Sequence, residues 1–414
     1  MLTGWVLLLS ACDSGSALPL PKATVAVDPL PQIRANLAFT CKHEEFPKPT
    51  ADTDTLFHYA RWLEKNNQLK RDPTVYAEIE RLYRVAAENG HAKANINLQN
   101  GSMRGDHYHL TGEEHLRFSQ QLIKAGVATG YYFVAIFLNQ GAAGLREDQE
   151  MALRYYRKAA DEGSANAQAY VADKLAPSDR APDIARQMRR CAAEQGQGNA
   201  ASDLGFDLKN EQQYQKALEA FQLGVVAGNE TSAYALELSF RNSSTSLRQP
   251  KDLERADRYK TIWRILARYS YASPKVPEIN DIVPLPPAKL PPWDGKLQWV
   301  EERKANVPPP KPSEALIEQL AKAKQLNPAT GRPLPESPNF MRQASDLTCE
   351  SDQACPLAGY WVAQSYWSQE VRYFKQGDIL PRCWGKDFVP RIWPLPDKMV
   401  DREWIIKWGY IGEA

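Results

Sequence analysis

The stretch EDQEMALRYYRKAADEGSANAQAYVADKL, residues 147–175, decides the fold of this chain. Its first half predicts a helix, because apolar residues recur at steps of three and four along one face: Ala152, Tyr155, Tyr156, Ala159 and Ala160. Gly163 ends that helix, since glycine accepts the left-handed conformation that closes a helix C-terminus. A second helix begins near Asn166 and carries its own apolar face: Ala167, Tyr170, Val171 and Leu175. The stretch therefore predicts two helices joined at Gly163.

The same pattern of small residues around a glycine recurs along the chain, at residues 86–94, 124–130, 159–167, 192–201 and 226–233. The pivotal glycines are Gly90, Gly126, Gly163, Gly196 and Gly228, so the steps between them are 36, 37, 33 and 32 residues. A period of this size is typical of a helical solenoid, in which each helix pair buries its apolar face against its neighbours. We expect the five glycines to be structural turn residues.

The repeating unit resembles the SEL-one-like repeats, relatives of the tetratricopeptide class, and residues 147–175 match them most closely. The resemblance extends over residues 52–271, a little over half of the chain. It implies a mainly α fold, a right-handed α/α solenoid of helix pairs that we assign to residues 51–272. Solenoids offer long concave surfaces, so this resemblance favours binding over catalysis.

The first twelve residues predict a lipoprotein signal. Residues 5–9 are apolar, and Leu9-Ser10-Ala11-Cys12 follows, which resembles a bacterial lipobox. In that family the cysteine becomes the lipidated first residue of the mature protein, so the resemblance implies lipidation at Cys12. The expected location is the periplasm, with a lipid anchor in the inner or the outer membrane. Asp13 resembles an inner-membrane retention signal.

Residues 13–50 predict a tether. Pro19, Pro21, Pro29 and Pro31 fall in this segment, and its apolar residues show little periodicity. A flexible chain of the length of residues 13–38 spans roughly 30 Å root-mean-square, which is enough to hold a solenoid clear of a membrane surface.

Composition argues against a nucleic-acid-binding protein. The 414 residues contain 51 Lys and Arg against 50 Asp and Glu, which gives a net charge of +1. There is no basic run that would attract a polyanion. We expect contact with a membrane only through the lipid anchor.

Five cysteines remain besides Cys12: Cys41, Cys191, Cys349, Cys355 and Cys383. An oxidising periplasm allows disulfides, yet an odd number leaves at least one thiol free. Cys349 and Cys355 lie six residues apart in a loop-like stretch and are the first pairing to expect. Cys355 with Cys383 is the alternative. The chain has no CxxC pair, which argues against a zinc ribbon.

Residues 273–345 predict a proline-rich connector. Prolines at positions 284, 286, 287, 291 and 292 forbid a helix and favour an extended path. The segment is too apolar for a free linker, so we expect it to lie strand-like along the solenoid and cap its open end. Further along, residues 313–325 predict a short helix with Ser313 as its N-cap.

Residues 346–414 are dense in aromatic residues, and short aromatic and β-branched runs broken by Gly and Pro predict a small β-rich module. The phrases CPLAGYW (355–361) and VRYFKQGDILP (371–381) resemble a motif of immunity proteins encoded beside polymorphic toxins and type VI secretion effectors. The matching residues are Cys355, Pro356, Gly359, Trp361, Arg372, Phe374, Gly377 and Pro381. The alternative reading is that these residues define the fold of the module without marking its contact site.

Motifs of catalysis are absent from the sequence. There is no Gly-x-Ser-x-Gly elbow, no phosphate-binding glycine loop and no His-Glu-x-x-His. One cluster could bind zinc or could be solvated loop residues: Asp106, His107, His109, Glu113, Glu114 and His115. We expect no enzyme, no cofactor and no physiological metal site.

Two functions remain open. The first is a periplasmic immunity lipoprotein that binds a toxic type VI effector and occludes its active site, because lipid anchor, solenoid and C-terminal motif resemble such proteins. Lipoproteins with these repeats resemble antitoxins of phospholipase-type effectors, which implies a phospholipase as the target. The alternative is a cell-envelope scaffold or chaperone that acts through its repeats. Residues near helix ends are candidate partner contacts: Arg154, Lys158, Arg186, Arg189 and Glu219.

Overall fold

The computed structural model describes residues 37–414, apart from 107, 177–180, 243–246, 341–346, 366–369, 390–397 and 413–414. The lipobox with Cys12 and residues 13–36 of the expected tether lie outside the described residues. From Phe39 onward the chain forms one compact unit. No helix in the described part of the chain combines the length and the apolar composition needed to cross a membrane.

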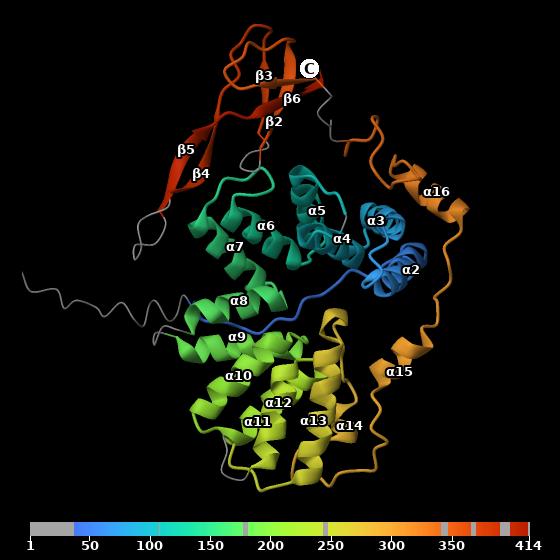
Figure 1. The fold of residues 1–414 in the computed structure, drawn as a ribbon, viewed down its shortest axis with the longest axis vertical. Helices are drawn as coiled ribbons and strands as arrows, with labels where there is room; N and C mark the ends of the chain where they lie inside the picture. Colours follow the sequence, from blue (N-terminus) through green and yellow to red (C-terminus); the bar gives the residue numbers. More distant parts are fainter. Residues whose placement is uncertain are drawn as a thin grey trace, which may run out of the picture. The chain divides into compact units, whose positions relative to one another are not determined.

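The repeats fold as successive helices that pack side by side (Figure 1). They are α2 (Ala51–Asn67), α3 (Pro73–Glu88), α4 (Ala92–Arg104), α5 (Gly112–Lys124), α6 (Thr129–Gln140), α7 (Gln149–Asp161), α8 (Ala165–Leu175), α9 (Pro182–Glu194), α10 (Gly198–Asn210), α11 (Tyr214–Val226), α12 (Glu230–Arg241) and α13 (Leu253–Arg268). The fold is therefore the mainly α solenoid of helix pairs that the repeat pattern predicts.

Each expected glycine lies in the turn between the two helices of a pair. Gly90, Gly126, Gly163, Gly196 and Gly228 all have positive φ, from 76° to 112°. This left-handed conformation lets the chain leave one helix and enter the next at little cost when the residue has no Cβ. At Gly163 the turn separates α7 from α8, at the position that the sequence indicates.

Small residues inside the helices let neighbouring helices approach closely. A side chain at Gly205 on α10 would overlap the ring of Phe221 on α11, and one at Gly101 on α4 would overlap the ring of Tyr108. Phe221 and the neighbouring Leu236, Phe240 and Tyr259 are buried in one hydrophobic cluster. The interior is thus built from aromatic rings set against glycine and alanine, as expected for closely crossing helices.

The connector packs on the repeats as coil with short helices, not as the strand-like segment that its prolines suggest. A short 3-10 helix, η1 (Ser270–Ala272), precedes it, and it contains α14 (Ile279–Ile282), α15 (Gln298–Ala305) and α16 (Glu314–Ala323). Ile279, Val283 and Leu297 are buried against α11 to α13. Further along, Ile317 and Ala321 of α16 are buried in the cluster of α2 and α3. The connector therefore runs from the last repeat back to the first.

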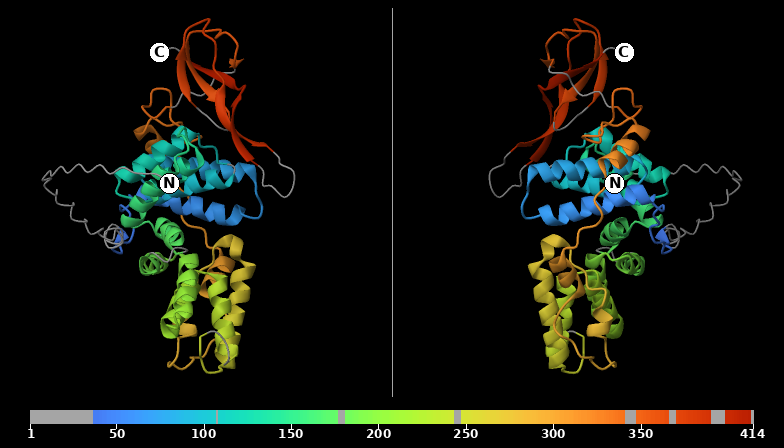
Figure 2. Two further views of the ribbon diagram at one scale, coloured as in Figure 1. Left: turned by 90° about the vertical axis from the view of Figure 1, so that its left-hand side faces the viewer. Right: turned by 90° about the vertical axis from the view of Figure 1, so that its right-hand side faces the viewer.

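The C-terminal module is the β-rich part (Figure 2). Its strands are β1 (Thr348–Glu350), β2 (Gly359–Gln364), β3 (Val371–Phe374), β4 (Cys383–Val389), β5 (Lys398–Trp404) and β6 (Lys407–Gly412). One antiparallel sheet has the order β1-β6-β2-β3, and β4 pairs with β5 in a separate ribbon. The core of the module is formed around Trp361, Trp408 and Leu380, which are fully buried.

Candidate partner-binding surface

The extended residues 41–46, here named the strap, lie across the turns of the repeats (Figure 1). The strap contacts the helix pairs in the reverse of their chain order. Cys41 bonds to α9, Lys42 pairs with Glu162 at the end of α7, and Glu44 caps α6. Phe46 then lies under Lys93 of α4, with the Lys93 Nζ 5.4 Å from the ring centre. Residues that the sequence assigns to the tether are thus part of the folded unit.

The Glu44 side chain connects the strap to the start of α6 by hydrogen bonds. Its carboxylate accepts hydrogen bonds from the backbone N–H of Thr129, at 2.5 Å, and from the Thr129 hydroxyl, at 2.9 Å. Its backbone N–H donates to Oε1 of Gln195 at 2.8 Å. Burial raises the pKa of Glu44, although both bonds from Thr129 oppose that effect. Because Thr129 is the first residue of α6, Glu44 supplies the helix N-terminus with an acceptor and a negative charge.

Lys42 fixes the strap to the next helix pair. Its ammonium lies 2.7 Å from a carboxylate oxygen of Glu162, and Lys158 lies 2.7 Å from the other oxygen. The hydrogen bonds from these two lysines lower the pKa of Glu162 to about 2. The Lys42 backbone carbonyl accepts a bond from the Gln168 side chain at 2.9 Å. These groups are half exposed, so the ion pairs position the strap more than they stabilise it.

The strap approaches the turn at Gly163 too closely for a side chain. A Cβ on Gly163 would lie 2.7 Å from the backbone N of Glu44 and 2.8 Å from the carbonyl oxygen of His43. At Gly228 a Cβ would overlap the carbonyl of Pro274 in the connector, whose neighbour Val276 donates to the Val226 carbonyl at 3.0 Å. The chain's own extended segments therefore cover two of the repeat turns, those at Gly163 and Gly228.

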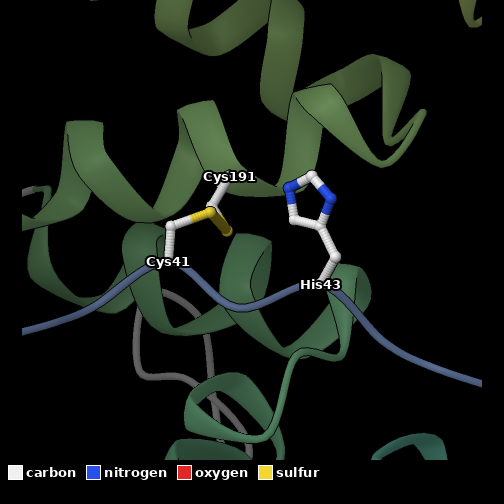
Figure 3. A group of neighbouring side chains, drawn as sticks. All are labelled: Cys41, His43 and Cys191. Carbon is white, nitrogen blue, oxygen red and sulfur yellow. A yellow bond between two sulfur atoms is a disulfide. The ribbon is translucent and has the colours of Figure 1, made fainter.

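The disulfide differs from both expected pairings. Cys41 of the strap bonds to Cys191 of α9 (Figure 3). Cys349, Cys355 and Cys383 are buried in the core of the C-terminal module. Cysteines close in sequence were expected to pair, but the fold brings together two that are 150 residues apart.

His43 lies beside this disulfide, and Figure 3 shows its ring next to Cys191. The ligand atoms of Cys41, His43 and Cys191 lie within 4.8 Å of one another, a spacing that suits a metal ion. Both sulfur atoms are committed to the disulfide, however, and a metal needs thiolates. The oxidised protein therefore does not offer these residues as a metal site.

The histidine cluster predicted from the sequence does not converge on one point. His115 is buried, with Nδ1 3.2 Å from Gln99 Oε1 and Nε2 3.1 Å from the Ser102 hydroxyl. Glu114 is buried and pairs with Arg84 at 2.6 Å. His109 is exposed, and His107 lies outside the described residues. Among the residues that the structure describes, the cluster forms no group of metal ligands.

The five candidate contact residues lie in different environments. Arg154 and Lys158 are exposed on α7 and pair with Glu150 and Glu162 along the same helix face or turn. Arg186 is three-quarters buried beside Glu211, and Glu219 is exposed on α11. Arg189, which was expected to face solvent, is buried between Asp173 and Asp207. Burial and two ion pairs give Arg189 a structural role.

The residues of the C-terminal motif shape the module. Cys355 and Phe374 are buried, and Trp361 donates from Nε1 to the Leu357 carbonyl at 3.0 Å. The N–H of Gly377, which has a φ of 91°, donates to the Cys355 carbonyl at 2.8 Å. The Pro381 carbonyl accepts from Trp408 Nε1 at 2.9 Å, and that of Pro356 accepts from Gln376 at 3.2 Å. The contacts favour the reading in which the motif defines the fold.

Gly359 and Arg372 are the remaining two residues of the motif. Gly359 has a φ of 147° and pairs with Phe374 across β2 and β3. Arg372 pairs with Trp361 across the same strands, but its guanidinium is partly exposed and binds the Glu370 carboxylate at 2.8 Å and 2.9 Å. Arg372 is the motif residue whose charged group reaches the surface of the sheet edge.

A second, exposed set of apolar side chains covers the module, and we name it the aromatic face. Eleven of the 22 large hydrophobic side chains that are exposed in the described part of the chain lie between residues 347 and 405. Tyr360 of β2 and Tyr373 of β3 are cross-strand neighbours with ring centres 5.4 Å apart. Val371 lies on the same side of β3 as Tyr373, and Trp384 and Met399, which share one side of the paired strands β4 and β5, are the other members that we assign to the face. Alternation explains the exposure of Tyr360 beside the buried Trp361, because odd and even positions of β2 point to opposite sides of the sheet.

The ribbon of β4 and β5 adds to the aromatic face without a core of its own. Trp384 is 66 % exposed and pairs with Glu403 across the ribbon. A two-stranded ribbon is marginally stable in water unless it packs on another surface. Exposed tryptophan and tyrosine of this kind are the residues that most often anchor protein–protein interfaces. The aromatic face is therefore the candidate surface for a protein partner.

Comparison with known proteins gives one family match and several similar structures. Residues 232–334 match a domain of unknown function, DUF6396. This segment contains most of α12, all of α13 and the greater part of the connector. None of the curated proteins matches this sequence.

Three solved structures illustrate the structural similarity. PA5086 of Pseudomonas aeruginosa is 25 % identical, with a TM-score of 0.48, over 60 % of this chain and 95 % of that one. The immunity protein PA5088 of Pseudomonas aeruginosa is 24 % identical, with a TM-score of 0.48, over 60 % and 94 %. A Sel1 repeat protein from Oxalobacter formigenes is 18 % identical, with a TM-score of 0.40, over 51 % and 87 %. The solved structures to which the chain is similar thus include a Sel1 repeat protein and an immunity protein.

Proposed function

We propose that this chain is an immunity protein of the bacterial periplasm, which binds a toxic type VI secretion effector and neutralises it. The observation that carries the proposal is the aromatic face, which lies on the same module as the immunity-type motif. The motif residues form the module, and the aromatic face is exposed on it. This arrangement suits a protein that acts by binding another protein.

The target that we propose is a phospholipase-type effector whose active site is occluded in the complex. This rests on the resemblance of lipid-anchored SEL-one-like repeat proteins to antitoxins of such effectors. Occlusion requires contact area and no chemistry, which accords with a sequence that lacks catalytic motifs. The interface that we propose has the standard size of about 800 Å² per partner and combines the aromatic face with part of the repeats.

A pull-down tests the proposal. The bait is the mature chain from Asp13, with Cys12 omitted, and the prey is the product of the neighbouring toxin-like gene. We expect a nanomolar complex in which the effector loses its phospholipase activity. If no neighbour encodes a toxin and no tight complex forms, the immunity proposal is wrong and an envelope scaffold becomes the better explanation.

We further propose that lipidation at Cys12 anchors the protein to a membrane facing the periplasm. The Cys12→Ser variant should move from the membrane fraction to the soluble periplasmic fraction, whereas wild type should remain with membranes. Continued membrane association of the variant would contradict the lipid anchor and would leave the binding proposal unaffected.

A further inference from the structure

A pocket of about 520 Å³ lies where the connector meets the first repeat helix. We name it the basic pocket. One wall comes from α2, with Arg61, Trp62 and Lys65, and the other comes from residues after the last repeat, with Lys275 and α15. A pocket of this volume suits a small-molecule ligand. Neither the motifs of the sequence nor the proposed immunity function uses it.

Contacts between the two walls hold the pocket open in a defined shape. Trp62 Nε1 donates to the Asn306 carbonyl at 3.4 Å. The side-chain amides of Asn66 and Asn306 donate to each other's oxygens at 3.2 Å and 2.8 Å. Asn306 has a φ of 44° and caps α15, so the two walls meet at a fixed turn. The pocket is therefore a built feature of the first repeat and the connector.

Positive charge gathers in this pocket from both walls. Arg61 and Lys65 lie one helical turn apart on α2, while Lys275 and Arg303 come from the opposite side. Glu302 is the carboxylate at the rim, and Arg61 also binds Glu64 at 2.6 Å. Burial and the nearby Arg303 lower the pKa of Lys65, against the opposing effect of Glu302. The cations thus repel one another across the pocket, and a bound anion would relieve that repulsion.

The remaining lining residues indicate which chemical groups the non-anionic part of the ligand carries. Trp62 and Trp299 present flat apolar rings, and Arg303 lies 5.5 Å from the ring centre of Trp299. Gln68 adds an amide side chain to the lining.

From these groups we infer that the basic pocket binds a small organic anion, with a carboxylate or phosphate held by the lysines and arginines. Its body stacks on the tryptophan rings. Guanidinium groups bind both anion types in a bidentate manner, so the geometry suits either chemistry. The ligand would join the first repeat to the connector and so tighten the closure of the unit.

Titration calorimetry and thermal unfolding, at constant ionic strength, test this inference with three probes: glucose 6-phosphate, phenyl phosphate and 4-hydroxybenzoate. Glucose and phenol are the matched neutral ligands. We expect saturable binding of at least one anion, a raised unfolding temperature, and no binding of its neutral counterpart. The phosphate and carboxylate probes separate the two chemistries.

Variants locate the site. Lys65→Gln and Lys275→Gln should each weaken anion binding at least tenfold, while Lys70→Gln, an exposed cation outside the pocket, should leave it unchanged. Without ligand, Lys65→Gln should unfold at the same or a higher temperature, because it removes one of the mutually repelling charges. Absence of saturable binding by all three anions, or equal weakening by Lys70→Gln, would overturn the inference. Neither result would affect the toxin pull-down, so the two proposals fail separately.

Discussion

Cys41 and Cys191 form a disulfide that joins the strap to α9 across 150 residues of sequence. Around this bond, Gln168 donates to the Lys42 carbonyl and His43 lies 3.6 Å from the carboxylate of Glu194. The strap is therefore held both covalently and by polar contacts to three successive helices. The strap therefore begins at a fixed point on the repeats.

Removal of this disulfide should destabilise the folded unit. A cross-link that closes a long loop lowers the entropy of the unfolded chain, so Cys41→Ser with Cys191→Ser should lower the free energy of unfolding by about 3–5 kcal/mol. Urea unfolding followed by circular dichroism measures the change. Dithiothreitol should destabilise wild type by a similar amount and should have no effect on the double variant. A wild-type midpoint that is insensitive to reduction would contradict the disulfide.

Gly163→Ala should cost more stability than Gly126→Ala. Both glycines have positive φ, at 112° and 76°, so both variants carry the strain of a left-handed alanine, about 1–2 kcal/mol. Only at Gly163 does the added Cβ also meet the backbone of the strap, whereas nothing lies within 4 Å of a Cβ on Gly126. The larger loss at Gly163 therefore reports the contact with the strap together with the higher φ of that residue. Equal losses would show that the strap does not press on this turn.

The repeat fold was predictable because its signals are local. A glycine turn and an apolar face each lie within about 30 residues of sequence. The pattern occurs five times, for example at Gly163 and Gly228, and each copy strengthens the prediction of a repeat. The strap has no such signal, since residues 41–46 follow a proline-rich stretch and bury little apolar surface. Its position depends on partners such as Thr129 and Glu162, which lie far away in sequence.

The candidate contact surface was less predictable for a related reason. Arg189 was selected because it lies near a helix end, but Asp173 of α8 and Asp207 of α10 come from neighbouring helices to neutralise it. Charge pairing between helices depends on the tertiary structure, so it cannot be predicted from the sequence of one helix. The aromatic residues of the module were visible in sequence, yet which of them are core and which are exposed depends on strand register. Trp361 and Tyr360 are adjacent in sequence and lie on opposite sides of β2.

Acid should destabilise the protein through His115. Burial lowers the pKa of His115 from 6.5 to about 4 in the folded state. The unfolded chain therefore binds a proton at higher pH than the folded protein does. Stability from this group is complete above pH 6.5 and is lost as the pH falls toward 4, by up to about 3 kcal/mol.

Guanidinium unfolding at pH 7, 5.5 and 4.5 measures this loss. His115→Gln removes the titrating group, so the variant should lose less stability than wild type between pH 7 and pH 4.5. His58→Gln, at an exposed position of α2, is the control and should follow wild type. Parallel pH profiles for wild type and His115→Gln would show that another group is responsible.

The aromatic face should carry the affinity for the protein partner. Trp384 is 66 % exposed and Tyr373 is 49 % exposed, and neither side chain belongs to the buried core of the module. Truncation of an interface anchor costs about 2 kcal/mol or more, so Trp384→Ala and Tyr373→Ala should each weaken binding of the effector about 30-fold. Leu153→Ala is the matched control, because Leu153 is 49 % exposed on α7, outside the face. Calorimetry with the effector measures the three affinities, and unchanged unfolding temperatures show that the variants are folded. If Leu153→Ala weakens binding while Trp384→Ala does not, the repeats and not the C-terminal module make the decisive contact.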